Sequence, residues 1–242
     1  MMLKFIDTHI HLQDFKPDCA PAVIDSPVAE KLVLISSRVE DLEQVPLWVN
    51  KYSQKCMGAL GFHPWYWQPD LPMDALYEKL KKYPKALVGE IGVDALRRPV
   101  DLKQHWLFSY QLKMAEELSR PVIVHAAKAF EPLMRHEPEL KSVRYVHHGF
   151  VKNEELLEFI NRTGGYIGLG TLFVKQERAK EMWAKMPRQR VLFETDAPYR
   201  VNDGSYLLSA QSQLHQLAQT VGEDVDALCE QLNENARDFL DF

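Results

Sequence analysis

The amino-acid sequence predicts an α/β protein folded as one (β/α)8 barrel with an extra C-terminal helix. Eight short apolar runs alternate with amphipathic segments, which is the order of parallel βα units, and eight such units close a barrel. The length of 242 residues is typical of one barrel domain, here residues 1–242. The main alternative is an open doubly wound sheet, but the first turn lacks the glycine-rich phosphate pattern of many such sheets.

In the first half of the chain, apolar runs predict strands over residues 4–11, 31–36, 55–61 and 86–94. Residues 17–27 contain prolines and aspartates and predict a loop with at most a short helix. Apolar residues at helical spacing predict helices over residues 40–54 and 71–83. The second of these helices is expected to end before Pro84, because a residue that precedes proline disfavours helical backbone angles.

In the second half, aliphatic runs predict strands over residues 121–125, 143–148, 166–170 and 190–196. The intervening segments predict helices over residues 102–119, 128–136, 154–162, 176–185, 207–220 and 225–240. The helix over 102–119 carries an apolar stripe that is expected to pack against the sheet. This stripe consists of Trp106, Tyr110, Met114 and Leu118.

The composition predicts a globular, cytoplasmic protein. Hydrophobic residues make up 46% and charged residues 26%, which is ordinary for a folded domain. A net charge of −5 argues against non-specific coating of nucleic acid, which needs many cations. Three widely spaced cysteines indicate reduced thiols. Charges at the start argue against a signal peptide, and no apolar run reaches membrane-spanning length, so neither a membrane nor an obligate protein partner is expected.

Two histidines near the start, His9 and His11, lie two residues apart on the first strand. Side chains alternate along a strand, so both imidazoles point to one side, where a metal ion can accept both. Asp7 has the same parity and is predicted to accept the second ring N–H of a ligand histidine. A His-x-His pair alone is a weak signal, and a hydrogen-bonded and a solvated histidine are the simpler explanation.

Further strands also end in residues that can bind metal, and in a barrel these ends meet at one mouth. The set is His9, His11, His63, Glu90, His125, His147 or His148, and Asp196. Structural alternatives exist for single members: His125 can be a hydrogen-bonded core histidine, and Asp196 can cap the turn before Pro198. Glu90 is harder to explain in this way, because an unpaired carboxylate inside a core costs roughly several kcal/mol. Together, the set favours a metal site.

Four imidazoles and two carboxylates exceed the needs of one tetrahedral zinc ion and predict two divalent metal ions bridged by a carboxylate. Glu90 is the best bridging candidate, and Asp196 can both bind one metal and accept the proton of the attacking water. The ligand types leave zinc, manganese and magnesium open. His147 and His148 face opposite sides of a regular strand, and periodicity does not choose between them.

Six motifs resemble the TatD-type metal-dependent DNases of the amidohydrolase superfamily. They are Asp-Thr-His-Ile-His (7–11), Gly-Phe-His-Pro (61–64), Gly-Glu-Ile-Gly-Val-Asp (89–94), Pro-Val-Ile-Val-His (121–125), His-Gly-Phe (148–150) and Glu-Thr-Asp-Ala-Pro (194–198). The match runs in order across about four fifths of the chain. As a set, the motifs are highly specific.

This resemblance implies a (β/α)8 barrel that hydrolyses phosphodiesters with divalent metal, often as an exonuclease. It implies that His9, His11, Glu90 and Asp196 hold one metal ion. It implies that Glu90, His125 and His148 hold the other, which favours His148 over His147. His63 would lie near the substrate phosphate or behind the ligands.

Substrate contacts depart from the family pattern in two places. The family commonly has arginine two residues after the histidine of the fifth strand, where this chain has Ala127 followed by Lys128, and lysine lacks the bidentate fork of arginine. The small polar loop after His-Gly-Phe is Val151-Lys152-Asn153 here. A basic rim is expected from Lys128, Lys152, Lys175 and Arg200. The aromatic run at 65–67 can stack bases or cover a helix.

Three functions remain open at this stage. The first is a metal-dependent phosphodiesterase acting on DNA ends or small nucleotides, with Asp196 and Glu90 as catalytic residues and His63, Lys128 and Arg200 as substrate-binding residues. The second is hydrolysis of an amide, lactone or ester at the same two-metal site, because one fold serves many reactions. The third is a binding protein without turnover, and the retained Asp196 argues against it.

Overall fold

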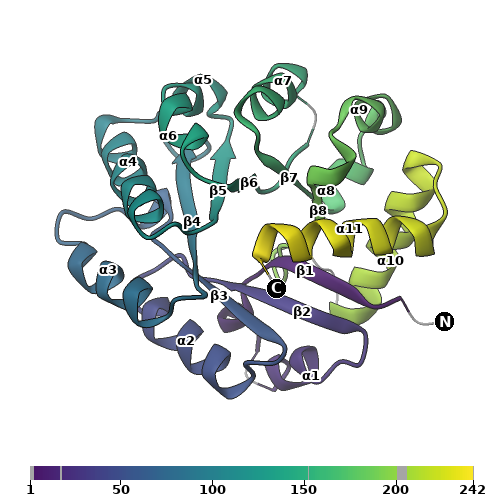
Figure 1. The fold of residues 1–242 in the computed structure, drawn as a ribbon, viewed down its shortest axis with the longest axis horizontal. Coiled ribbons are helices and arrows are strands. Elements are labelled where there is room, and N and C mark those ends of the chain that lie inside the picture. The colour runs from purple at the N-terminus through teal and green to yellow at the C-terminus, as the bar shows by residue number, and fades with distance from the viewer. Residues whose placement is uncertain (1–2, 17, 152, 201–205, 242) are drawn as a thin grey trace.

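The computed structural model describes residues 3–16, 18–151, 153–200 and 206–241. Within these residues, eight strands form one parallel sheet in the order β1 to β8, with each strand next to its neighbours in the sequence (Figure 1). The strands are β1 Phe5–Ile10, β2 Ala29–Ile35, β3 Cys56–Leu60, β4 Leu87–Asp94, β5 Val122–Ala127, β6 Tyr145–His147, β7 Tyr166–Leu169 and β8 Val191–Phe193. The predicted strand order is therefore confirmed.

The barrel closes between β1 and the segment that follows β8. The backbone N–H of Asp196 donates to the carbonyl of His9 at 3.0 Å, and the N–H of His11 donates to the carbonyl of Ala197 at 2.8 Å. Ile10 and Ala197 form a parallel bridge at the same point. The (β/α)8 barrel is confirmed, and its closure brings the start and the end of the chain to one mouth.

Helices surround the sheet on its outer side, as Figure 1 shows. The α-helices are α1 Ala20–Ile24, α2 Asp41–Lys51, α3 Met73–Lys82, α4 Leu102–Glu117, α5 Phe130–Met134, α6 Glu137–Lys141, α7 Glu154–Thr163, α8 Thr171–Val174, α9 Ala179–Lys185, α10 Tyr206–Val221 and α11 Val225–Leu240. Short 3-10 turns are η1 Leu12–Asp14, η2 Pro64–Tyr66 and η3 Arg188–Arg190. The predicted extra C-terminal helix is α11.

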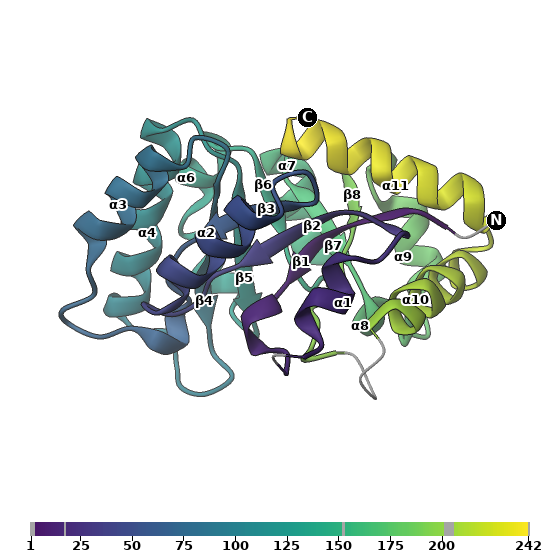
Figure 2. The same cartoon turned by 90° about the horizontal axis from the view of Figure 1, so that it is seen from below.

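Helix α11 covers the end of the barrel where the strands begin. Its residues Ala236, Phe239 and Leu240 belong to one buried cluster with inward-facing residues of all eight strands. Asn233 accepts the backbone N–H of Ile6 at 2.9 Å, and Asn235 donates to the carbonyl of Val191 at 2.8 Å. Figure 2 shows this helix along the upper edge of the molecule. One end of the barrel is thus filled, and the opposite mouth is left for chemistry.

Several element boundaries differ from the prediction, including those of one helix and one strand in the second half of the chain. The helix expected over 128–136 is divided into α5 and α6, because Pro138 lies at the start of a helix and cannot continue one from the preceding residues. The strand expected over 190–196 ends at Phe193, so Asp196 lies in the following loop with a left-handed φ of 54°. Asp196 is therefore carried by loop backbone rather than by a strand.

The apolar stripe expected on α4 is confirmed for Met114, which is buried, and for Leu118, which packs against the core, but it is wrong for Trp106 and Tyr110. Trp106 is 52% exposed and Tyr110 is 38% exposed, and their rings pack against each other at 5.2 Å on the solvent side. The buried face also includes Gln104 and Gln111. Each glutamine amide bonds both backbone groups of one residue at the sheet, Asp94 for Gln104 and Phe62 for Gln111. Polar side chains face inward here because their hydrogen bonds are satisfied.

This arrangement makes a stability prediction. Replacing Gln111 with leucine is expected to lower the free energy of unfolding by about 1–3 kcal/mol, because the buried backbone groups of Phe62 lose their partners. Replacing the exposed Trp106 with alanine is expected to cost less than about 1 kcal/mol. Urea denaturation followed by circular dichroism measures both. A larger loss for Trp106→Ala than for Gln111→Leu would contradict the assignment of the buried face.

The described residues include no helix that is both long enough and apolar enough to span a membrane.

Candidate metal centre

A cavity of about 1140 Å³ opens at the mouth formed by the carboxyl ends of the strands. The predicted site residues that line it are His11, His63, Glu90, His125, His147, His148, Asp196, Lys128 and Arg200. His9 is fully buried beside them and contacts them from beneath. The structure therefore brings together residues from β1, from β4, from β5 and from the segments after β3, β6 and β8.

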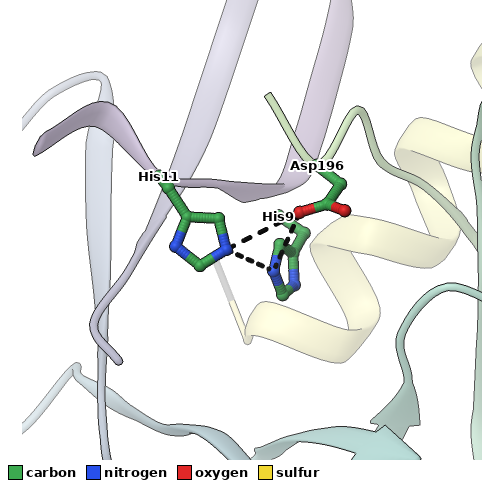
Figure 3. A group of neighbouring side chains, drawn as sticks. All are labelled: His9, His11 and Asp196. Atoms are coloured by element: carbon green, nitrogen blue, oxygen red, sulfur yellow. Dashed lines mark hydrogen bonds and ion pairs between the residues drawn. The ribbon is translucent and has the colours of Figure 1, made fainter. Parts of the chain in front are cut away.

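One half of the site is built by β1 and the loop after β8. His9 Nε2 and His11 Nε2 face each other at 3.1 Å, so the two histidines point to the same side, as strand alternation predicts. Asp196 Oδ1 lies 3.9 Å from His9 Nε2 and 3.6 Å from His11 Nε2 (Figure 3). Glu90 Oε2 lies 3.5 Å and 3.7 Å from the same two nitrogens.

The other half of the site surrounds the second oxygen of Glu90. Oε1 lies 2.7 Å from His125 Nδ1, 3.7 Å from His148 Nε2 and 3.9 Å from His63 Nε2. Each oxygen of this one carboxylate thus faces a different set of imidazoles. The side chain of Glu90 is only 4% exposed, so its partners are these histidines rather than solvent.

Three groups among the described residues bring their potential ligand atoms within 4.8 Å of one another. They are His9 with His11 and Asp196, His9 with His148 and Glu194, and His63 with Glu90 and His125. Imidazole nitrogens and carboxylate oxygens are common ligands of divalent transition metals. Glu90, His9 and their neighbours form one continuous cluster, since the groups overlap in space.

Close strand packing holds Glu90 and His125 together. Gly92 on β4 has a φ of 151°, and a Cβ atom there would lie 1.9 Å from the carbonyl oxygen of His125 on β5. A side chain at position 92 is therefore excluded by both backbone angle and space. Glycine permits the close approach of the two strands that carry these ligands.

Burial and neighbouring charges move the pKa values of the site in opposite directions. Burial disfavours the charged form of His148, but Glu194 and Glu90 outweigh it and raise the pKa to about 10. Burial is likewise outweighed at His125, where Glu90 and Asp94 raise the pKa to about 8. Burial and the nearby His9 lower the pKa of His11 to about 4. The cluster thus concentrates negative charge from carboxylates and attracts cations.

The prediction for Asp7 was wrong. Its carboxylate does not bond a histidine ring but accepts the backbone N–H groups of His9 and Thr195, each at 3.1 Å. It also accepts the hydroxyls of Thr195 at 2.6 Å and Tyr206 at 2.7 Å. Burial raises the pKa of Asp7 to about 6, and these hydrogen bonds offset part of that shift. Asp7 therefore ties β1 to the loop that carries Asp196.

Periodicity left His147 and His148 undecided, and their contacts differ. His148 stacks on His9 with ring centroids 3.6 Å apart, and its Nδ1 lies 3.0 Å from Glu194 Oε1. His147 is also buried, but among the residues that the structure describes its ring nitrogens have no carboxylate oxygen within 4 Å. His148 is thus the member of the pair that joins the carboxylates.

Two carboxylates of the site were missed by the sequence analysis. Asp94 Oδ2 accepts the Nε2–H of His125 at 2.7 Å, and Glu194 contacts His148 and accepts the backbone N–H of Gly149 at 2.7 Å. Each lies an even number of residues from a predicted ligand, Asp94 four after Glu90 and Glu194 two before Asp196. This shared parity was the available signal.

The predicted basic rim is only partly formed in the described residues. Lys128 and Arg200 line the cavity, and Arg200 Nε lies 3.4 Å from Asp196 Oδ2. Lys175 is not among the cavity-lining residues, and Lys152 lies outside the described residues. Of the aromatic run, Trp65 and Tyr66 line the cavity. Trp67 packs instead beneath Lys103 of α4, whose Nζ is 4.6 Å from its ring centroid.

Comparisons with known proteins identify the relatives of this chain. The sequence profile of the family described as TatD related DNase matches residues 6–241. The Escherichia coli K12 protein named uncharacterized metal-dependent hydrolase YjjV is 30% identical over 211 residues, 82% of this chain and 81% of that protein. The Pantoea ananatis protein named 3′-5′ ssDNA/RNA exonuclease TatD is 29% identical over 228 residues, 85% of this chain and 86% of that protein.

A solved structure extends the similarity to the fold. The crystal structure of the TatD homolog YjjV from Escherichia coli K12 superposes with a TM-score of 0.85 at 27% identity, covering 100% of both chains. A parallel barrel with histidines and carboxylates gathered at its mouth, together with these relatives, defines an enzyme of the metal-dependent hydrolase class. The chain belongs to the TatD family, whose description is TatD related DNase.

Proposed function

We propose that residues 1–242 act as one domain of a divalent-metal-dependent phosphodiesterase that cleaves nucleic-acid ends, with two metal ions and Asp196 as general base. The proposal depends on the two oxygens of the Glu90 carboxylate, which face different pairs of histidines. Oε2 faces His9 and His11, and Oε1 faces His125 and His148. The exonuclease name of the Pantoea ananatis relative supports nucleic acid as the substrate.

The donor set fits two cations. Asp196 would join His9, His11 and Glu90 Oε2 at the first ion, and His125 and His148 would join Glu90 Oε1 at the second. His9 Nε2 and His11 Nε2 lie 3.1 Å apart and face two carboxylate oxygens, an arrangement in which a cation satisfies nitrogen lone pairs and balances charge. When bound, such a pair of ions makes water more acidic and neutralises developing charge on a phosphoryl group.

Asp196 is the carboxylate best placed to meet water. Its side chain is 17% exposed, compared with 4% for Glu90, so Asp196 reaches the open cavity while Glu90 is enclosed by histidines. Arg200 contacts Oδ2 at 3.4 Å and leaves Oδ1 on the side of His9 and His11. In this position Asp196 accepts the proton of the attacking water.

In the neutral tautomer of His63, Nε2 carries the proton and can donate a hydrogen bond. Its Nδ1 accepts the backbone N–H of Trp65 at 3.1 Å, so the proton of the neutral ring is on Nε2. Burial and the nearby His125 lower the pKa of His63 well below its ordinary value, which keeps the ring neutral. Its Nε2–H therefore donates to a phosphoryl oxygen of the substrate, and Lys128 on the cavity wall adds positive charge.

The test is hydrolysis of a 3′-labelled single-stranded oligonucleotide in magnesium or manganese, compared with a panel of carbonyl esters, lactones and amides. We expect the oligonucleotide to be shortened from one end, and EDTA to abolish the reaction. The carbonyl substrates are expected to react at least about 100-fold more slowly, in line with the discrimination that polar sites achieve.

Two results would overturn this proposal. If a carbonyl substrate is hydrolysed faster than the oligonucleotide, the same residues catalyse hydrolysis of an amide, lactone or ester. Metal binding with no turnover of any substrate would indicate a binding protein.

A further inference from the structure

An arginine outside the metal centre reaches the wall of the same cavity. Arg97 lies on the loop between β4 and α4, and its Cζ is 3.6 Å from the ring centroid of Trp65. Trp65 lies two residues after His63, and its ring centroid is 6.3 Å from that of His125. Arg97 and Trp65 both line the cavity, so a cation is stacked beside the candidate metal centre.

The guanidinium of Arg97 is held in place but is not neutralised. Among the described residues, no carboxylate lies within 4 Å of it, whereas Arg38 and Arg200 each contact an aspartate. A guanidinium that stacks on an indole ring is oriented by the ring, and the N–H groups at the edge of the guanidinium stay free to donate hydrogen bonds. That edge is the part of arginine that binds a phosphate group through two parallel hydrogen bonds.

A small side chain lies beside the start of the loop that carries Arg97. The strand register pairs Asp94 with Ala127, and the backbone N–H of Ala95 donates to the carbonyl of Ala127 at 2.9 Å. The loop that carries Arg97 therefore leaves β4 next to a residue with a one-carbon side chain. Arg97 and Lys128 thus contribute two cations to this part of the wall.

The cavity is slightly larger than a typical small-molecule site. Its volume of about 1140 Å³ exceeds the range of roughly 300–1,000 Å³ that is usual for small-molecule sites. A substrate that fills it extends beyond the bond that is cleaved. In a nucleic acid, the neighbouring groups that carry charge are the next phosphates along the strand.

We propose that Arg97, stacked on Trp65, binds a non-scissile phosphate of a nucleic-acid strand whose end lies at the metal centre. This inference rests on the proposed phosphodiesterase function and deepens it. Arg97 is a substrate-binding residue that contacts the strand away from the reacting bond. It makes the enzyme prefer oligonucleotides to mononucleotide diesters.

The experiment compares Arg97→Ala, Arg97→Lys and the control Arg98→Ala in the full-length, metal-loaded enzyme. Arg98 is the neighbouring exposed arginine and does not line the cavity. Two substrates are used: a single-stranded oligonucleotide and the p-nitrophenyl ester of thymidine 5′-monophosphate, which has one phosphodiester and no further phosphate. The kcat and KM values are measured at several salt concentrations. Fluorescence anisotropy with a labelled phosphorothioate oligonucleotide, which resists cleavage, provides dissociation constants.

For Arg97→Ala we expect about a tenfold higher KM and dissociation constant for oligonucleotides, with kcat nearly unchanged. The slope of log affinity against log salt should fall by about 0.7, the value for one contact with a single strand. Arg97→Lys should keep that slope and lose part of the affinity, because lysine has the charge without the fork. Arg98→Ala should leave KM, kcat and the dissociation constant unchanged. Arg97→Ala should leave kcat and KM for the small ester unchanged.

The outcomes separate this inference from the proposed function. If Arg97→Ala and Arg98→Ala have the same KM and dissociation constant for an oligonucleotide that the wild type cleaves, the role of Arg97 is overturned and the proposed function is not. An equal loss on the small ester would also overturn it, because the contact would then involve the scissile phosphate. A wild type that cleaves neither phosphodiester would overturn both proposals.

Discussion

Replacing Asp196 with asparagine is expected to lower kcat on an oligonucleotide by a factor of about 10²–10⁴, the range that a positioned general base contributes. Asparagine has nearly the same size but cannot accept a proton from water. The backbone N–H of Asp196 would keep its bond to the carbonyl of His9, so the loop should keep its place. His9, His11 and Glu90 would remain as ligands, so metal binding is expected to weaken rather than disappear.

Steady-state kinetics and metal analysis by mass spectrometry, made on the same preparation, test this expectation. Glu131→Gln is the matched control, because Glu131 is an exposed carboxylate on the cavity wall and should leave kcat within about twofold. Full activity of Asp196→Asn would contradict the role of general base. If kcat falls in proportion to the amount of bound metal, Asp196 acts as a metal ligand and not as a general base.

The barrel was predictable because its signals are local. Each strand is a short aliphatic run, and each connection is long enough for a parallel crossover. Once eight such units are expected, barrel geometry sends the carboxyl ends of all strands to one mouth. The positions of His9, Glu90 and His125 near one another follow from this rule without knowledge of any side-chain contact.

The errors arise where the partner is distant in the sequence. Asp7 has the parity expected of a residue that supports a ligand, but its hydroxyl partners are Thr195 and Tyr206, about 190 positions away. Nothing local indicates those contacts. On α4, counting apolar residues selected Trp106 and missed Gln111, because a glutamine amide that bonds backbone groups is as well suited to burial as an apolar side chain.

The finer structure of the site was also beyond sequence reasoning. Alternation places Glu90 at the mouth, but the different imidazoles that Oε1 and Oε2 face depend on contacts between distant segments. Arg97 gave no signal, because it lies in an exposed loop and its position depends on stacking with Trp65 from another loop. Loop side chains are set by contacts between segments and not by the period of either segment.

Replacing Glu90 with glutamine is expected to disrupt both halves of the proposed metal centre. Glu90 lies within 4 Å of five imidazoles, those of His9, His11, His63, His125 and His148. A neutral amide offers one weaker oxygen and turns an NH2 group toward the other set of nitrogens. Both ions that we propose depend on this side chain, so the variant should retain at most one ion per chain and lose nearly all turnover.

Thermal unfolding with and without metal gives a readout that does not depend on activity. For the EDTA-treated wild type, adding manganese or zinc at about 100 times its dissociation constant should stabilise the fold by about 2.7 kcal/mol for each ion bound. Glu90→Gln should lose most of this shift. Glu194→Gln is the comparison, because Glu194 contacts His148 and the backbone of Gly149 and is expected to change metal affinity by about 10- to 100-fold.

The contrast between these two variants is the decisive result. If Glu90 bridges two ions, its loss affects both halves of the site, whereas the loss of Glu194 affects only the orientation of His148. A Glu90→Gln protein that still holds two ions and melts like the metal-loaded wild type would contradict the bridge. If the two variants lose the same part of the metal-dependent stabilisation, Glu90 supports only one half of the site. The proposal of a second ion would then be contradicted.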